Sequence, residues 1–145
     1  MIIFGKVGQF MISDVVLNKI SVIERCVKRI HEEYDNNPDH LNDYTKQDSI
    51  VLNILRACEA SIDLSMHLVA VKKLGVPQTS RKAFDILFEN NIISKETTER
   101  MKAMVGFRNI AVRDYQTLNM VVVRKIVEEH LVELKRYTVE IQSHT

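Results

Sequence analysis

The segment 106–115, with the sequence GFRNIAVRDY, holds the side chains of this chain best suited to chemistry on an anion. The guanidinium groups of Arg108 and Arg113 suit binding of a phosphate, and the phenol of Tyr115 follows directly. Two further polar side chains lie within the segment, those of Asn109 and Asp114. This cluster is the first candidate site.

The spacing within this segment limits how its residues meet. On one continuous helix Arg108 and Tyr115 lie about 20° apart, whereas Arg108 and Arg113 lie about 140° apart. All three side chains therefore cannot point into one site from a regular helix. Either the helix ends near Val112 and the chain turns, or a second copy of the chain completes the site.

A second group of polar residues lies earlier, where Glu59, Asp63 and His67 follow one another at intervals of four, with Arg56 close by. On a helix these residues stack along one side, next to an apolar stripe. They are interpreted either as a ladder that supports the helix or as a polar row beside an active cleft.

Other chemistries have no support in the sequence. No phosphate-binding glycine loop, zinc-protease motif or hydrolase nucleophile elbow is present, and no cofactor is implied. Cys26 and Cys58 show no metal-ligand spacing and are predicted to be buried thiols of a cytoplasmic protein. No metal site is expected from the five separated histidines, His31, His40, His67, His130 and His144.

Charge is unevenly distributed along the chain. The total of 20 Lys and Arg against 19 Asp and Glu gives a formal net charge of +1, which argues against a protein that coats nucleic acid through overall basicity. Residues 31–49 include six acids and one lysine, whereas residues 95–125 include seven bases and three acids. The anion-facing surface is therefore expected around the motif, and no apolar run is long enough to predict a membrane span.

Hydrophobic periodicity predicts an all-α antiparallel bundle of four long helices plus a short one, in a single domain over residues 1–145. Residues 1–12 are a possible flexible extension, with Met11 a possible natural start. The first helix is predicted over 14–34, capped by Ser13 or Asp14. A capping box at Thr45–Asp48 opens the second, which ends at Gly75. Thr79 or Ser80 caps the short helix, Ser94 caps the fourth, and the last helix begins near Leu118.

The segment GFRNIAVRDY resembles the Arg-x4-His-x-Tyr motif of the HepT-like HEPN ribonuclease toxins, where the usual text is close to FRNIAVHDY. The likeness continues through the stretches NKISVIERCVKRI, QDSIVLNILRACEASIDLSMHL and LGVPQTSRKAF, and so covers nearly the whole chain from about Met11. It implies a HEPN-like fold and metal-independent cleavage of RNA at a dimer cleft.

Transferred to this sequence, the resemblance makes Arg108 the catalytic arginine, Asn109 and Asp114 its polar neighbours and Tyr115 the motif tyrosine. Glu59 and Asp63 of the polar row are interpreted as supporting polar groups. This chain departs from the motif at Arg113, where the family has histidine. Imidazole transfers protons near neutral pH, whereas guanidinium stays protonated. We therefore expect the family activity to be impaired in this chain.

The resemblance also implies partners. The family forms homodimers and pairs with MntA, a nucleotidyltransferase antitoxin that silences the toxin by transferring AMP to the motif tyrosine, which is Tyr115 here. The alternative is a non-catalytic HEPN-type dimeric partner of a nucleotidyltransferase, which the arginine at position 113 favours.

Overall fold

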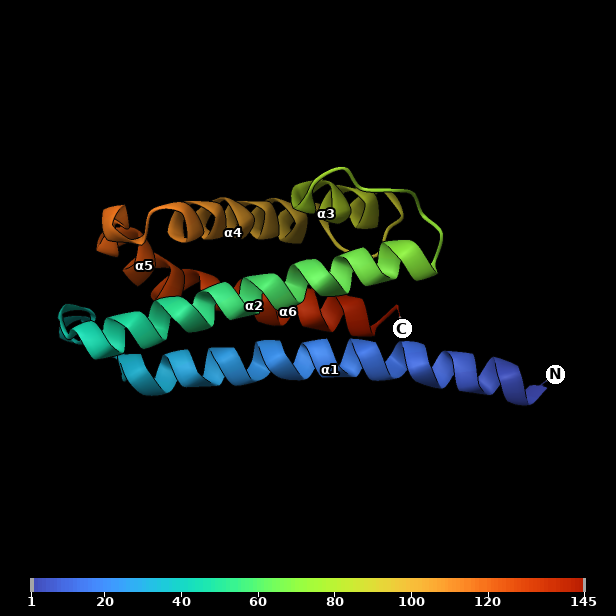
Figure 1. The fold of residues 1–145 in the computed structure, drawn as a ribbon, viewed down its shortest axis with the longest axis horizontal. Coiled ribbons are helices and arrows are strands. Elements are labelled where there is room, and N and C mark those ends of the chain that lie inside the picture. The colour runs from blue at the N-terminus through green and yellow to red at the C-terminus, as the bar shows by residue number, and fades with distance from the viewer. Residues whose placement is uncertain (1, 145) are drawn as a thin grey trace.

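The fold is built from helices joined by short turns, as the computed structural model shows (Figure 1). The structure describes residues 2–144, and the side chains from Asp14 to His144. The elements are α1 (Ile2–Tyr34), the 3-10 turn η1 (Pro38–Asn42), α2 (Tyr44–Val71), α3 (Ser80–Glu89), α4 (Lys95–Arg113), the 3-10 turn η2 (Tyr115–Thr117), α5 (Met120–Lys125), the π turn η3 (Ile126–His130) and α6 (Leu131–Gln142). The prediction of an all-α fold is confirmed.

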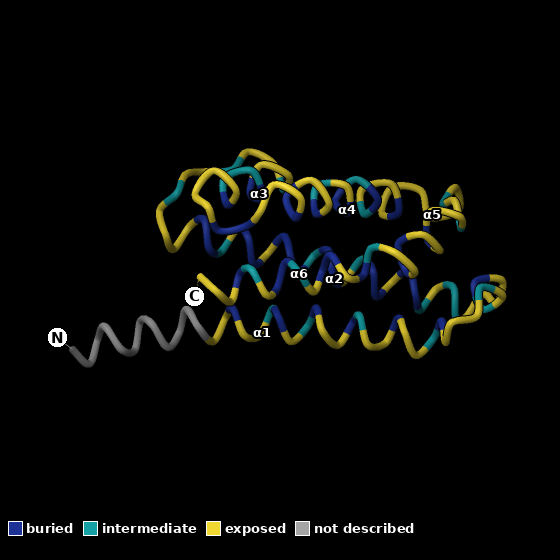
Figure 2. Tube along the Cα trace, turned by 180° about the vertical axis from the view of Figure 1, so that it is seen from behind, coloured by how far each residue is buried: buried dark blue, intermediate teal, exposed yellow. Residues whose placement is uncertain are grey.

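The long helices run in alternating directions, so that α1 and α4 point one way and α2 and α6 the other. α1 lies along one side of the bundle, α2 and α6 lie in the middle, and α3 and α4 form the opposite side (Figures 1 and 2). Each long helix turns its apolar stripe inward, where the buried residues form one core cluster (Figure 2). Because α2 lies between α1 and α4, it contributes side chains to both sides of the bundle.

The start of the first helix differs from the prediction. α1 is continuous from Ile2, so neither Ser13 nor Asp14 caps it. The predicted flexible extension at residues 1–12 falls on residues whose side chains lie outside the described part of the chain.

Helix starts follow the predicted capping residues in two of four cases. The Thr79 hydroxyl accepts a hydrogen bond from the Lys82 amide, and Ser94 Oγ accepts one from the Thr97 amide. The capping box predicted at Thr45–Asp48 is wrong. Asp43 caps α2 instead, accepting from the Lys46 amide at 3.1 Å, so the Asp48 carboxylate is not used as a cap.

The predicted end of α2 at Gly75 is also wrong, because the helix ends at Val71. Lys73 adopts φ +54°, and the Leu74 amide donates back to the Val69 carbonyl at 3.0 Å. This is a Schellman closure with lysine at the left-handed position that glycine usually takes. Gly75 has φ +145°, and its freedom from a side chain serves the turn after the helix.

The single last helix that the sequence predicts is divided by a π turn at 126–130. Its buried residues include Val123, Val127 and Leu131, four apart, and on a regular α-helix each step of four turns the side chain about 40° further round. A wider π turn reduces this drift, so both α5 and α6 keep their apolar sides against the core.

None of the helices in the described residues is long and apolar enough to cross a membrane.

Candidate functional site

The motif arginine lies near the end of α4 and is held by an acidic residue of α2. The Arg108 guanidinium donates from Nε to Glu59 Oε1 and forms an ion pair with the same carboxylate through its second terminal nitrogen. Its other terminal nitrogen donates to Asn109 Oδ1 at 2.9 Å. The Arg108 side chain keeps 28% of its surface exposed, so it is oriented by protein groups but still reachable from solvent.

The motif tyrosine lies beyond the helix. α4 ends at Arg113, and Tyr115 begins the η2 turn. The Tyr115 hydroxyl donates to Asp48 Oδ1 of α2 at 2.5 Å, and the side chain is 36% exposed. Partial burial, followed by the hydrogen bond to Asp48 and its negative charge, raises the pKa of Tyr115 to about 12.

Arg113 is the last residue of α4 and is exposed. Among the described residues it has no hydrogen bond or ion pair. Asp114 is the helix cap, and its backbone carbonyl accepts from the Thr117 hydroxyl at 3.0 Å. Arg113 thus presents an unpaired positive charge to solvent next to the turn that holds Tyr115.

A further guanidinium lies on the same side of α4 as Arg113. Arg81 of α3 donates from Nε to the Lys102 carbonyl at 3.3 Å and lies against Gly106. A Cβ at Gly106 would be 2.6 Å from a terminal nitrogen of Arg81, so glycine allows this close approach. Gly106 and Arg113 are seven residues apart, which places them about 20° apart around the helix.

The structure separates the polar residues of α2 that the sequence grouped together. Glu59 pairs with Arg108 of α4, but Asp63 faces α1 and forms an ion pair with Lys19 at 3.2 Å. His67 has its Nε2 atom buried without a hydrogen-bond partner in the described structure. These residues do not form a ladder with one another, and Asp63 is not brought to the motif.

The two motif contacts on α2 lie well apart. Asp48 and Glu59 are eleven residues apart, which corresponds to about 16 Å along a helix axis. Arg108 and Tyr115 therefore do not converge on one point within a single chain. Of the two explanations that the sequence left open, the turn is present, because Tyr115 lies outside α4, but the turn alone does not assemble a compact site.

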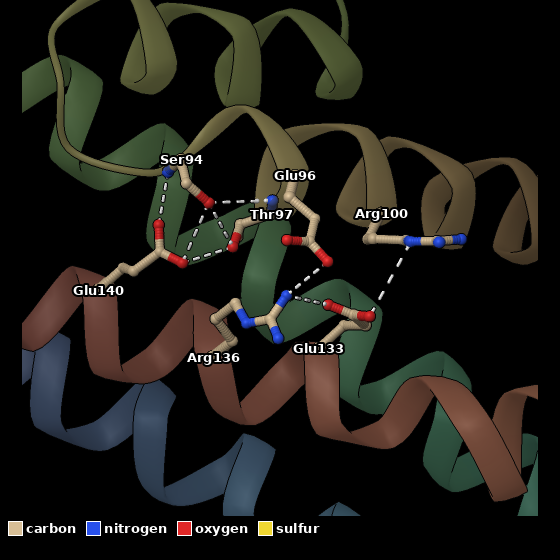
Figure 3. A network of polar contacts seen from close by, with 7 residues as sticks. All are labelled: Ser94, Glu96, Thr97, Arg100, Glu133, Arg136 and Glu140. Atoms are coloured by element: carbon tan, nitrogen blue, oxygen red, sulfur yellow. Dashed lines mark hydrogen bonds and ion pairs between the residues drawn. The ribbon is translucent and has the colours of Figure 1, made fainter.

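The opposite end of α4 is fixed to α6 by a polar network (Figure 3). The Glu140 carboxylate accepts from the Ser94 amide and from the Thr97 hydroxyl, each at 2.5 Å. Arg136 bridges Glu96 at 2.8 Å and Glu133 at 3.2 Å. This network anchors the helix that carries Arg108 and Arg113.

The buried thiols were predicted correctly. Cys26 and Cys58 are both buried and free, and the Cys58 thiol donates weakly to the Met104 carbonyl at 3.8 Å. Burial raises the pKa of both thiols, that of Cys58 to about 12, so neither is a reactive nucleophile. No group of three or more potential metal ligands occurs within the described residues.

Sequence reasoning missed Asp48 and Arg81 as parts of this surface. Asp48 lies 67 residues before Tyr115, and its sequence context suggested a helix cap. The available signal was that Asp43 is able to cap the helix, which leaves the Asp48 carboxylate free for another contact. Arg81 gave no local signal, because its place over Gly106 depends on how α3 packs against α4.

Comparison with known proteins identifies a similar sequence and similar folds. A curated relative, the mRNA nuclease HepT of Shewanella oneidensis, is 43% identical over 125 residues, which cover 86% of this chain and 94% of that protein. A solved structure of the tri-AMPylated Shewanella oneidensis HEPN toxin in complex with MNT antitoxin is similar at TM-score 0.85 and 42% identity, covering 90% of this chain and 98% of that one. A toxin–antitoxin structure with AMP-PNP is similar at TM-score 0.86, with the same identity and coverage.

These likenesses confirm the HEPN-like fold that the sequence predicted. The model of the family described as ribonuclease HepT-like matches residues 20–141, a range that includes Glu59, Arg108 and Tyr115. By this match and the 43% identity to a curated member, the chain belongs to the HepT-like ribonuclease family.

Proposed function

We propose that this protein is the toxin of a toxin–antitoxin pair, built for metal-independent cleavage of RNA, and that Arg113 leaves this chain impaired in cleavage. Its family membership and its 43% identity to an mRNA nuclease support the substrate class. The observation that carries the proposal is the motif itself, with Arg108 oriented and reachable at the surface and Tyr115 exposed beyond the helix end.

Arg108 is suited to hold an RNA phosphate. Glu59 and Asn109 together orient its guanidinium, yet each terminal nitrogen has two N–H groups, so donors remain for a phosphate oxygen. A charge-assisted bond of this kind is strongest when the group is already oriented. Arg81 and Arg113 add positive charge on another side of α4, about 140° around the helix from Arg108, for neighbouring phosphates.

A complete site requires two copies of the chain. Arg108 and Tyr115 are held at points of α2 about 16 Å apart, so one chain does not gather them. In a homodimer, the motif of one protomer faces the motif of its partner across a shared cleft. The exposed apolar side chains Ile110 and Val112, on the same helix end, suit such an interface.

The guanidinium of Arg113 holds a phosphate but does not accept a proton from the ribose 2′-hydroxyl, because it stays protonated at all physiological pH values. Imidazole in the same place accepts and donates protons near neutrality. Loss of a proton-transfer group costs about 10² to 10⁴ in rate. Impairment of this chain by that amount is therefore part of the proposal.

Tyr115 is the proposed acceptor of AMP from a nucleotidyltransferase antitoxin. The similar Shewanella toxin was solved in AMPylated form with its MNT antitoxin. In this chain the Tyr115 hydroxyl is at the surface, where a second enzyme can reach it. An adenylate there places a negative charge and a bulky group two residues from Arg113, which blocks an RNA phosphate both electrostatically and sterically.

The direct test is Arg113→His. The variant and the wild-type chain are incubated with RNA in the presence of a chelator, and each is expressed with and without the nucleotidyltransferase. We expect about 10² to 10⁴ faster cleavage and growth arrest from the histidine variant, both relieved by the transferase. An Arg113→Lys variant is the matched control and should gain nothing, and cleavage no faster with histidine would contradict the proposed impairment.

A second candidate function is a non-catalytic dimeric partner of a nucleotidyltransferase. The exposed Arg113, in a place where proton transfer would be needed, favours it for the chain as it stands. The same experiment separates the two functions. A dimer that accepts AMP on Tyr115 but cleaves no RNA even with histidine at 113 would establish the binding function.

A further inference from the structure

The contact between Tyr115 and Asp48 joins two residues that are far apart in sequence. The phenolic hydroxyl donates to Asp48 Oδ1 at 2.5 Å, across 67 residues of chain. Both side chains are exposed, so the hydroxyl and the carboxylate that receives its hydrogen bond are open to solvent together. An incoming group therefore reaches the hydroxyl without any rearrangement of the core.

The other tyrosines differ from Tyr115 in this respect. Tyr34 also donates to a carboxylate, that of Glu128, but Tyr34 is 3% exposed and Arg124 neutralises the same carboxylate at 3.1 Å. Tyr137 is completely buried against Ser65. Tyr44 is 79% exposed and has no hydrogen-bond partner among the described residues. Of these tyrosines, Tyr115 is the one whose hydroxyl is accessible and donates to a carboxylate that has no ion pair in the described structure.

The carboxylates of α2 differ in the same way. Glu59 is paired with Arg108, and Asp63 with Lys19. Asp48 has no ion pair in the described structure, and its carboxylate accepts a hydrogen bond from the Tyr115 hydroxyl. Of these three carboxylates, that of Asp48 is therefore the one placed to accept the phenolic proton.

We propose that Asp48 orients the Tyr115 hydroxyl and accepts its proton when AMP is transferred to this tyrosine. The inference rests on the proposed role of Tyr115 as AMP acceptor from a nucleoside triphosphate. The phenolic oxygen forms a bond to the α-phosphorus, the bond from that phosphorus to the bridging oxygen of the β-phosphate breaks, and pyrophosphate leaves. The phenolic proton moves to Asp48 Oδ1 and then to solvent.

A proton acceptor is needed because Tyr115 is not ionised before the reaction. Its pKa is raised to about 12, so the neutral phenol is the form present at physiological pH. A phenol becomes a good nucleophile only as its proton leaves, and a base within hydrogen-bond distance lowers the barrier for that step. Asp48 meets the distance requirement in the free protein.

Transfer of AMP also breaks the hydrogen bond between Tyr115 and Asp48. The adenylate replaces the hydrogen that Tyr115 donates, so the modified oxygen and the Asp48 carboxylate are left as two acceptors without a proton between them. The modified side chain therefore separates from α2. A hydroxyl that has reacted is in this way released from the base that activated it.

The test uses the full-length chain with the MNT antitoxin of Shewanella oneidensis, magnesium and ATP labelled at the α-phosphate. Initial rates of label incorporation are measured between about pH 6 and pH 10 for the wild-type chain, Asp48→Asn and Asp48→Glu. Asn retains a hydrogen-bond acceptor but takes up no proton. We expect Asp48→Asn to be about 10²-fold slower near neutral pH, and Asp48→Glu to recover part of the rate.

The pH profile distinguishes proton acceptance from a structural role. The advantage of the wild-type chain over Asp48→Asn should shrink as the pH rises toward the pKa of Tyr115, about 12, because the phenol then loses its proton without a base. Asp39→Asn removes one charge from the same acidic stretch without touching the Tyr115–Asp48 hydrogen bond, and should leave the rate unchanged. Tyr115→Phe should accept no label.

The experiment distinguishes a failure of Tyr115 as AMP acceptor from a failure of the role of Asp48. If the wild-type chain takes up no label, while the Shewanella toxin does under the same conditions, or if the label is not on Tyr115, then the proposed acceptor itself is wrong and this inference with it. If Tyr115 is labelled at equal rates in the wild-type chain and in Asp48→Asn across the pH range, only the role of Asp48 is overturned.

Discussion

The two ends of α4 differ in how their polar groups are satisfied. At the start of the helix, the Ser94 amide and the Thr97 hydroxyl both donate to Glu140 of α6, and Glu133 is nearly buried between arginines (Figure 3). At the motif end, Arg108 and Tyr115 each meet a carboxylate of α2 at the surface, and Arg113 meets none among the described residues.

This difference indicates where chemistry is possible on the helix. At the start of the helix Thr97 and Glu133 are buried. A buried, paired polar group resists exchange of its partner, because the desolvated group would lose a hydrogen bond. A group that is paired at the surface exchanges its partner for water or a ligand at little cost. One end of α4 is therefore a support, and the other is the end at which a phosphate or a nucleotide is able to bind.

The largest expected effect comes from removing Arg108 in the chain whose activity has been restored. In the Arg113→His background, Arg108→Ala should lower RNA cleavage by about 10² to 10³, the usual cost of losing one donor to a developing charge. Its surface ion pair with Glu59 contributes no more than about 1 kcal/mol to folding. Cleavage rates and urea unfolding of the same samples check both values. A loss of activity matched by a loss of folded protein would contradict the assignment.

The support end should show the opposite behaviour. Glu140→Ala leaves the Ser94 amide and the Thr97 hydroxyl without their shared acceptor, which should lower the free energy of unfolding by about 1 to 3 kcal/mol. Below the unfolding transition, AMP uptake by Tyr115 should be unchanged. Val139→Ala alters an exposed neighbour on α6 and is the control, expected within about 0.5 kcal/mol of the wild type. Stability unaffected by Glu140→Ala would remove the contrast between the ends.

Alkaline pH should separate the exposed phenol of the motif end from a buried one. Burial and Glu128 raise the pKa of Tyr34 to about 12, above its ordinary value of 10.0. The folded state therefore holds this proton more tightly than the unfolded state. The resulting stability is complete below pH 10 and is lost as the pH rises through 12.

Urea unfolding across this pH window checks the prediction. Tyr34→Phe should flatten the decline in stability, whereas Tyr115→Phe should alter it much less, because solvent screens the more exposed pair. An equal effect of the two substitutions would show that the Tyr115 pair is as important for folding as the buried one.

The smallest effect is local. Tyr115→Phe removes the hydrogen bond that ties η2 to α2, so the amides of Thr117 and Leu118, which close the turn, should exchange hydrogen a few-fold faster. The Thr97 and Thr98 amides at the support end should not change. Hydrogen exchange followed by NMR tests this, and unchanged protection of the η2 amides would mean that the hydroxyl does not hold the turn.

Much of the fold was predictable because it depends on local periodicity. Hydrophobic spacing predicted the stripe Val16, Ile20, Ile23, Val27, Ile30 and Tyr34, and all of these are buried except Val27, which is half-buried. Thr79 and Ser94 cap the helices that they were expected to cap. The same spacing predicted inward positions for Met66 of α2, Phe88 of α3 and Val112 of α4, which are exposed. These residues lie at helix sides that no other element covers, and hydrophobic periodicity does not show which sides are covered.

The candidate site was predictable in its residues but not in its contacts. The motif spacing drew attention to Arg108, Arg113 and Tyr115, and the resemblance to a family added their expected roles. Neither the spacing nor the resemblance indicated that Glu59 and Asp63, four residues apart, would pair with different helices. Because α2 lies between α1 and α4, a small angular difference on its surface decides which neighbour each carboxylate meets.

The sequence by itself determined the helices, most of their inward faces and the basic segment that carries the motif, since these depend on residues within a few positions of one another. The tertiary structure alone decided that Asp48 receives the Tyr115 hydrogen bond, that Glu59 holds Arg108 and that Arg113 has no partner among the described residues. Such contacts join residues 49 and 67 positions apart. They follow from how the helices pack, which no local pattern specifies.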